Sequence, residues 1–101
     1  MRINGVRENQ NLFTVKMAKL DGEAKERAKK TIEKILLSLI QVDTLADMPY
    51  SLSRPSNTPI FRRANIDKEL RLYWRLDEDR NVIFHDICSH KEAKNYKDVH
   101  P

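Results

Sequence analysis

The run Leu70-Arg71-Leu72-Tyr73-Trp74-Arg75-Leu76 decides the fold, because its side chains alternate in character along the whole segment. Side chains on a β-strand repeat every two residues, so the run predicts a strand with two unlike faces. One face carries Leu70, Leu72, Trp74 and Leu76, which suits a hydrophobic core. The other carries Arg71, Tyr73 and Arg75. Two guanidiniums on either side of a phenol favour a phosphate-binding surface rather than a purely structural one.

The size and composition of the chain predict one domain over residues 1–101. Its 101 residues are 40% hydrophobic and 34% charged, which is typical of a globular protein and not of a disordered or membrane-embedded one. Its longest apolar run, at residues 35–37, is far too short to span a membrane. We expect residues 1–10 and 97–101 to be flexible at the two ends of the domain.

Two further features of the chain bear on its compartment. Cys88 is the only cysteine, which excludes an internal disulfide and fits a reducing compartment. The N-terminal residues contain no apolar signal-peptide core, so a cytoplasmic location is expected.

Basic residues concentrate between Arg54 and Leu76. This segment holds six basic and two acidic residues. Its excess of four positive charges equals the net charge of +4 of the whole chain. Five of the six are arginine, the side chain best suited to bidentate contact with phosphate. Charge alone fits a solvated face or a docking site for an acidic partner equally well.

The rest of the chain supplies the other elements. Leu12–Ala18 alternates and is predicted to be the first strand. Asp21 is predicted to cap a helix whose apolar stripe runs to Leu39, widened at its end by Leu37 and Ile40, so that this end should be the more deeply buried. A short helical piece over 44–48 ends before Pro49, and a long loop follows to Pro59. Strands are predicted over 60–64, 69–76 and 81–88, with a turn at 77–80.

This order predicts an α+β fold in which a strand, a helix and a partial helix precede a three-stranded antiparallel meander. The helical stripe should pack on one face of a small antiparallel sheet and leave the other face open. A hairpin that closes at residues 77–81 would set Trp74 opposite Phe84, Tyr73 near His85, and Arg71 near Ile87. Slippage of the register by one residue would turn His85 to the core.

Two segments of the sequence resemble the RelE/ParE superfamily of bacterial and archaeal toxins. The first is the third predicted strand, Leu70–Arg75, and the second is the ending Ser89-His90-Lys91-Glu92-Ala93 with Tyr96. The resemblance covers the chain from Leu12 onwards, and it implies a strand, a pair of helices and a meander. RelE-type members cleave messenger RNA in the ribosomal A site, whereas ParE-type members target DNA gyrase.

The resemblance also implies a set of site residues. Arg71 matches the arginine of the third strand, and Arg62 and Arg63 match the basic residues of the second. Lys91, or His90 beside it, matches the basic residue after the last strand, and Tyr96 matches the terminal tyrosine. The implied activity is a toxin that cleaves translated messenger RNA. The implied partners are ribosome-bound messenger RNA and a cognate antitoxin that is acidic where it meets the basic face.

Metal-free RNA cleavage needs groups that take and give a proton and cations that stabilise the developing charge. The arginines Arg62, Arg63 and Arg71 suit the last task, with Arg75 in a supporting or purely solvated role. His85 and His90 are candidates for acid and base, and Tyr73 or Tyr96 for stacking on a base. No histidine or cysteine spacing matches a metal site, so we expect no metal and no cofactor. A gyrase inhibitor and a non-catalytic nucleic-acid-binding module of the same fold stay open as alternatives.

Overall fold

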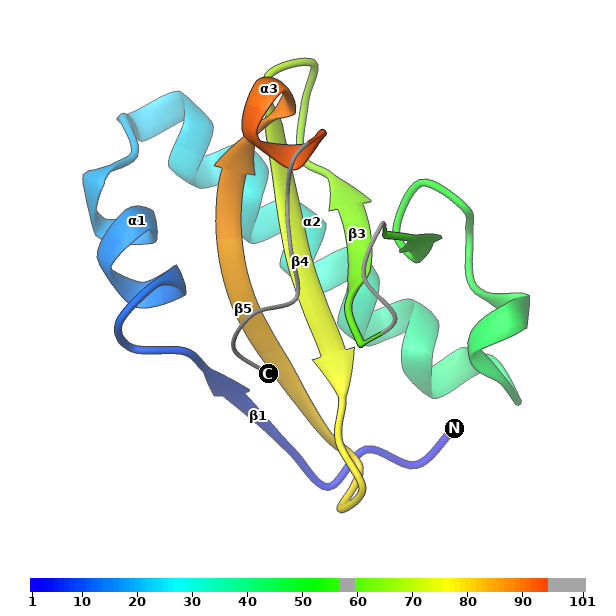
Figure 1. Cartoon of the computed structure of the whole chain (residues 1–101). Helices are drawn as coiled ribbons and strands as arrows, with labels where there is room; N and C mark the ends of the chain where they lie inside the picture. The colour runs from blue at the N-terminus through cyan, green and yellow to red at the C-terminus, as the bar shows by residue number, and fades with distance from the viewer. Residues whose placement is uncertain (57–59, 95–101) are drawn as a thin grey trace.

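The computed structural model describes residues 1–56 and 60–94, and it is a mixed sheet of five strands with three α-helices. The elements are β1 (Gly5–Glu8), α1 (Phe13–Lys19), α2 (Gly22–Gln41), the 3-10 helix η1 (Leu45–Asp47), β2 (Arg54–Pro55), β3 (Arg62–Asn65), β4 (Leu70–Leu76), β5 (Asn81–Ser89) and α3 (His90–Ala93). The sheet order is β1-β5-β4-β3-β2 (Figure 1). The α+β class is confirmed, and among the described helices none is long and apolar enough to cross a membrane.

The meander β3-β4-β5 is antiparallel as predicted, and its register explains which residues share a face. Trp74 pairs with Phe84, which confirms that prediction. Tyr73, however, pairs with Asp86 and Arg71 with Cys88, so the two other predicted neighbours were wrong. The cause is an irregularity between Tyr73 and Trp74 that leaves His85 as an extra residue on β5, which is a β-bulge.

The N-terminal part of the chain differs most from the prediction. Gly5–Glu8, expected to be loose, forms β1 and pairs in parallel with β5, so the sheet is mixed and not purely antiparallel. The segment Leu12–Ala18, predicted as a strand, is helical from Phe13 onwards and belongs to α1. The side chain of Asn9 accepts the N–H groups of Asn11 and Leu12 just before this helix. In a helix Phe13, Met17 and Leu20 share one side, and all three pack on the core.

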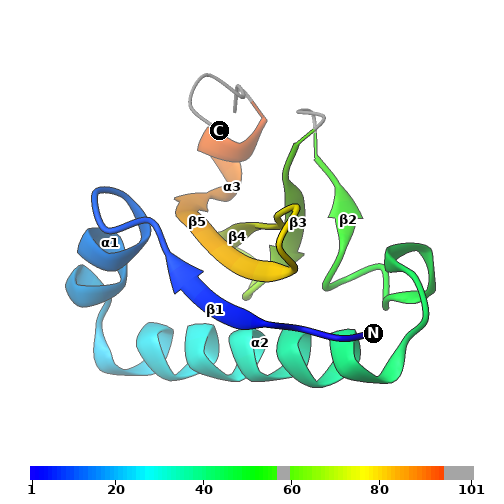
Figure 2. The same cartoon turned by 90° about the horizontal axis from the view of Figure 1, so that it is seen from below.

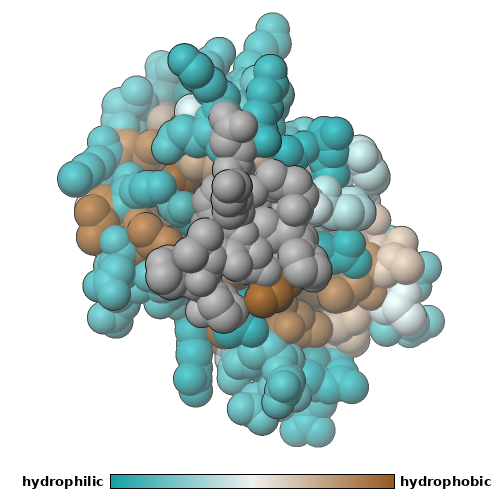
Figure 3. Space-filling model, in the orientation of Figure 1, coloured by the Kyte–Doolittle hydropathy of each residue, from teal (hydrophilic) through white to brown (hydrophobic). Residues whose placement is uncertain are grey.

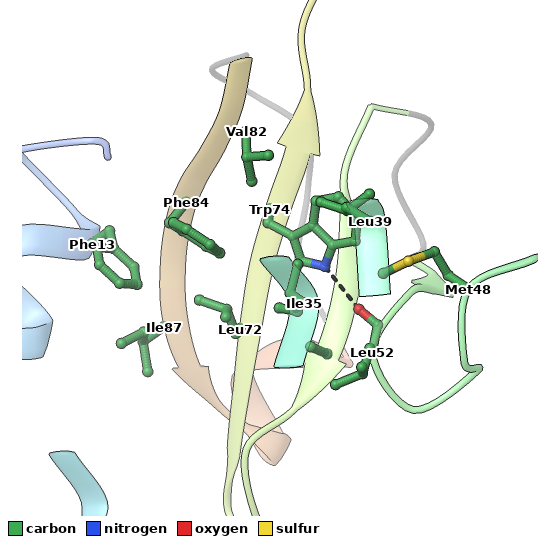
Figure 4. Close-up of a cluster of buried hydrophobic side chains, with 11 residues drawn as sticks. Phe13, Ile35, Leu39, Met48, Leu52, Leu72, Trp74, Val82, Phe84 and Ile87 are labelled. Atoms are coloured by element: carbon green, nitrogen blue, oxygen red, sulfur yellow. Dashed lines mark hydrogen bonds between the residues drawn. The ribbon is translucent and has the colours of Figure 1, made fainter. Parts of the chain in front are cut away.

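Helix α2 forms as predicted and covers one face of the sheet (Figure 2). The Asp21 carboxylate caps it by accepting the N–H of Ala24 at 2.8 Å. Its buried stripe, which includes Ile35 and Leu39, packs against Trp74 and Phe84 of the sheet (Figure 4). Leu37 and Ile40 are exposed, so the prediction of deeper burial at this end was wrong: both lie on the side of α2 that faces away from the sheet.

The second face of the sheet is not open, which corrects another expectation. Helix α3 lies over it, on the opposite side of the sheet from α2 (Figure 2). Phe61, Tyr73, Cys88 and Ala93 form a second, smaller buried cluster there. We call this side of the sheet the α3 face.

Candidate functional site

The candidate site lies at the edge of the α3 face, where β4 begins and β5 ends. Nη2 of Arg71 is 3.0 Å from Nδ1 of His90, 19 residues further along the chain. A guanidinium can only donate, so Nδ1 accepts and the neutral imidazole carries its proton on Nε2. His90 is exposed and Arg71 is half-buried, so a ligand can reach both. The surface in the region of α3, at the top of the view in Figure 3, is hydrophilic.

The turn before β4 holds Arg71 in place. Nη1 of Arg71 donates to the carbonyl oxygens of Asp67 at 2.6 Å and Leu70 at 3.1 Å. The Asp67 carboxylate in turn accepts the N–H groups of Glu69 and Leu70, and it pairs with Nε of Arg27 on α2 at 2.9 Å. Burial raises the pKa of Asp67, but these N–H groups and the Arg27 guanidinium outweigh it and lower the pKa. The turn is therefore anchored to α2 by a charged side chain.

Helix α3 fixes His90 and Lys91 through a capping box. The Ser89 hydroxyl accepts the N–H of Glu92, and the Glu92 carboxylate accepts the N–H of Ser89. The bond from the backbone of Ser89 lowers the pKa of Glu92. The N–H of His90 also donates to the carbonyl of Glu69 at 2.7 Å, which ties the start of α3 to the turn that holds Arg71. Lys91 is exposed beside His90.

Tyr73 does not reach this surface. Its side chain is 0% exposed within the α3-face cluster, and its hydroxyl lies 3.5 Å from the carbonyl of Ala93. Burial raises its pKa. A ring that is fully covered has no face for a base to stack on, so the structure does not support the predicted contact of Tyr73 with RNA. Ala93 of α3 belongs to the same buried cluster, and a helix over this segment was not among the predicted elements.

The three remaining predicted arginines are divided between the faces. Arg63 pairs with Tyr73 and therefore lies on the α3 face, where its buried Nε has no hydrogen-bond partner among the described residues. Arg62 pairs with Trp74 and lies on the opposite face. Arg75 pairs with Ile83 near the far end of β4 and is half-buried. The predicted basic stripe is therefore not one continuous surface.

His85 lies in the interior and not beside Arg71. It is 5% exposed, and its ring stacks on Phe61 with 4.1 Å between centroids. Its Nδ1 lies 3.4 Å from the side-chain nitrogen Nδ2 of Asn9. The neighbouring Asp86 is also buried and forms an ion pair with Lys16 of α1 at 2.7 Å. These contacts make His85 part of the packing between β5 and the segment that leads into α1. Tyr96, the last predicted site residue, lies outside the described residues.

Sequence reasoning missed Asp67 and the capping pair Ser89–Glu92 as residues that position the site. The capping pair carried a signal, because Ser-x-x-Glu is the pattern of a capping box. Asp67 carried none beyond its place in a turn. Among the described residues, no group of three or more His, Cys, Asp or Glu side chains is arranged to hold a metal ion. Comparison with protein-family models, curated proteins and solved structures finds no match to this chain.

Proposed function

We propose that this protein is a toxin of the RelE type, a metal-independent endoribonuclease that cleaves messenger RNA on the ribosome. The observation that carries the proposal is the contact between Arg71 and His90. An arginine can stabilise charge and a histidine can carry a proton, and these two side chains meet at an exposed position where β4 begins and β5 ends. The resemblance implies a strand, two helices and a meander, and the chain has this order with β1 at Gly5–Glu8 in place of the strand expected over Leu12–Ala18.

The chemistry starts with the guanidinium of Arg71. A phosphate that binds Arg71 competes with His90 for Nη2, because a phosphate oxygen is a charged acceptor and imidazole nitrogen is not. Nδ1 of His90 is then free to take the proton of the 2′-hydroxyl as that oxygen attacks the phosphorus. Arg71 and the ammonium of Lys91 stabilise the charge that develops on the phosphate. The bond to the 5′ oxygen breaks and that oxygen takes a proton from water, which leaves a 2′,3′-cyclic phosphate and a 5′-hydroxyl end.

The proposal also implies a partner. A toxin of this kind requires an antitoxin, and the exposed cations His90 (when protonated), Lys91 and Lys94 near the site favour an acidic segment of that partner. It further implies that the chain acts in the cytoplasm, where translated messenger RNA is found.

Induced expression tests the proposal against its nearest alternative. We expect growth arrest, new messenger ends within translated codons by primer extension, and unchanged supercoiling activity of purified gyrase. Arg71→Ala and His90→Ala should abolish the new ends, while Lys34→Ala, an exposed cation on the outer side of α2, should not. Inhibited gyrase with intact messenger RNA would replace the nuclease with a gyrase inhibitor.

A further inference from the structure

A groove lies at the other end of β4 from Arg71, next to the start of β3. It consists of two adjacent cavities of about 450 Å³ and about 390 Å³. Leu45, Pro55 and Arg62 line both of them. The groove exists because β4 continues to Leu76 while β3 begins at Arg62, so the last residues of β4 have no partner strand on that side. Hydrophobic surface gathers on this side of the molecule, at the lower right in Figure 3.

The charged groups of the groove are all positive. Arg62 and Arg75 line the larger cavity, and no acidic side chain is among the residues that line either one. Arg54, directly opposite Arg63 in the pairing of β2 with β3, stands at the same edge of the sheet. The groove therefore favours an anionic ligand.

Tyr50 supplies an aromatic surface at the smaller cavity. Its side chain is 66% exposed, and the guanidinium carbon of Arg54 lies 5.4 Å from its ring centroid. An exposed tyrosine next to arginines is the combination that binds single-stranded nucleic acid, with the ring under a base and the cations on the backbone. An acidic peptide would use the arginines but would leave the ring without a stacking partner.

A buried hydroxyl gives a second, independent sign of a ligand. Ser53 is only 6% exposed, lines the smaller cavity, and its Oγ has no hydrogen-bond partner among the described residues. A buried hydroxyl without a hydrogen-bond partner destabilises the fold. A polar group of a base or sugar in this cavity would satisfy it.

We propose that this groove binds one nucleotide of a single-stranded RNA, with its phosphate on Arg62 and its base on Tyr50. The choice of RNA rests on the proposed function, whereas the preference for an anion with a flat ring rests on the groove alone. Arg71 and Arg75 are four residues apart on β4, about 13 Å along the strand. The groove is therefore a contact separate from the cleavage site, because Arg62 lies on the opposite face of the sheet from Arg71.

Binding of an uncleavable RNA tests the groove without any need for cleavage. The probe is a short, fluorescently labelled 2′-O-methyl RNA, followed by anisotropy. Tyr50→Ala should weaken binding about tenfold and Tyr50→Phe should restore it, because stacking contributes about 1–3 kcal/mol per base. Arg62→Ala should lower the salt dependence by about 0.7 in slope, since one phosphate contact is lost. Leu37→Ala and Lys34→Ala, exposed on the outer side of α2, are the matched controls.

Three results would overturn the proposal. The first is binding that Tyr50→Ala leaves unchanged. The second is displacement of the RNA by a poly-glutamate peptide at equal charge, which would assign the groove to an acidic protein. The third is saturation by a mononucleotide as tightly as by the strand, which would assign it to a free nucleotide. If Tyr50 and Arg62 control RNA binding but the protein cleaves no messenger RNA, the groove is confirmed as an RNA-binding site and the nuclease function is wrong.

Discussion

Nη2 of Arg71 lies 3.0 Å from Nδ1 of His90, and this contact joins the beginning of β4 to the first residue of α3. It depends on the register of β4 with β5, in which Leu70 pairs with Ser89 and Arg71 with Cys88. The same contact assigns the proton of the neutral imidazole to Nε2. His90 is therefore held with its acceptor nitrogen toward the Arg71 guanidinium, the group to which a phosphate would bind.

Replacement of His90 by glutamine separates its role as a hydrogen-bond acceptor for Arg71 from its proposed role as a general base. His90→Gln keeps an acceptor for Arg71 but cannot take up a proton at neutral pH, so folding stability should stay within about 0.5 kcal/mol of the wild type. Cleavage should fall by about 100-fold or more, the usual contribution of a general base. Rates on ribosome-bound messenger RNA and urea denaturation measure the two effects. Wild-type cleavage by His90→Gln would reduce His90 to a residue that positions Arg71.

Asp67 should give the stability of the protein a specific dependence on pH. Because its pKa is lowered in the folded state, its contribution is complete above the unfolded pKa of about 3.9 and is lost as the pH falls through the folded pKa. Asp67→Asn keeps an oxygen for the N–H groups of Glu69 and Leu70 but removes the charge. Its free energy of unfolding should therefore fall less steeply than that of the wild type on acidification.

Denaturation in urea over a pH series down to about pH 2 measures this difference. Asp43→Asn, an exposed carboxylate after α2, serves as the control and should follow the wild type. Asp67→Ala also removes the acceptor and should cost about 1 kcal/mol more than Asp67→Asn at neutral pH. Parallel pH curves for the wild type and Asp67→Asn would contradict the role of the charge.

Cys88 should be unreactive in the folded protein. Burial raises its pKa to about 12, with Asp86 as the next cause, so the thiol stays protonated at pH 8. Alkylation by iodoacetamide, followed by mass spectrometry, should be slow in buffer and rapid in guanidinium chloride. Fast labelling of the folded chain would show that the α3-face cluster opens, and it would contradict the close packing of Tyr73 beneath α3.

Trp74 should be the most sensitive position of the main core. Its indole N–H donates to the carbonyl of Leu52 at 2.8 Å, and both groups are buried (Figure 4). Trp74→Phe leaves that carbonyl without its donor and removes part of the ring, so it should lower the free energy of unfolding by about 2 kcal/mol or more. Thermal or urea denaturation followed by circular dichroism measures it. Val15→Ala, at an exposed position of α1, should cost less than about 0.5 kcal/mol.

The elements that sequence predicts well are those with a strong local signal. Helix α2 has a capping aspartate and a long apolar stripe, and the 77–80 turn has an aspartate whose carboxylate accepts the N–H groups of Asp79 and Asn81. The segment at 12–18 is too short for its period to decide between strand and helix, and β1 carries no apolar alternation because most of its residues are exposed. Its pairing with β5 is a tertiary effect.

The candidate site follows the same division. Residue type and the resemblance named Arg71 and His90, but their contact depends on the bulge at His85, which no local pattern announces. That one extra residue turns the rest of β5 and sets Asp86, not His85, beside Tyr73. Tyr73 shares a buried cluster with Ala93 of α3. The capping box of this helix has a sequence pattern, whereas its packing on the sheet has none.

The nuclease function is tested most directly by cleavage of a defined messenger RNA on purified ribosomes, with the wild-type protein and with Arg71→Ala. We expect a cut that leaves a 2′,3′-cyclic phosphate and a 5′-hydroxyl end, and a rate at least about 100-fold lower for Arg71→Ala, since the cation stabilises the developing charge. Intact messenger RNA with the wild-type protein, or equal cleavage by Arg71→Ala, would contradict it.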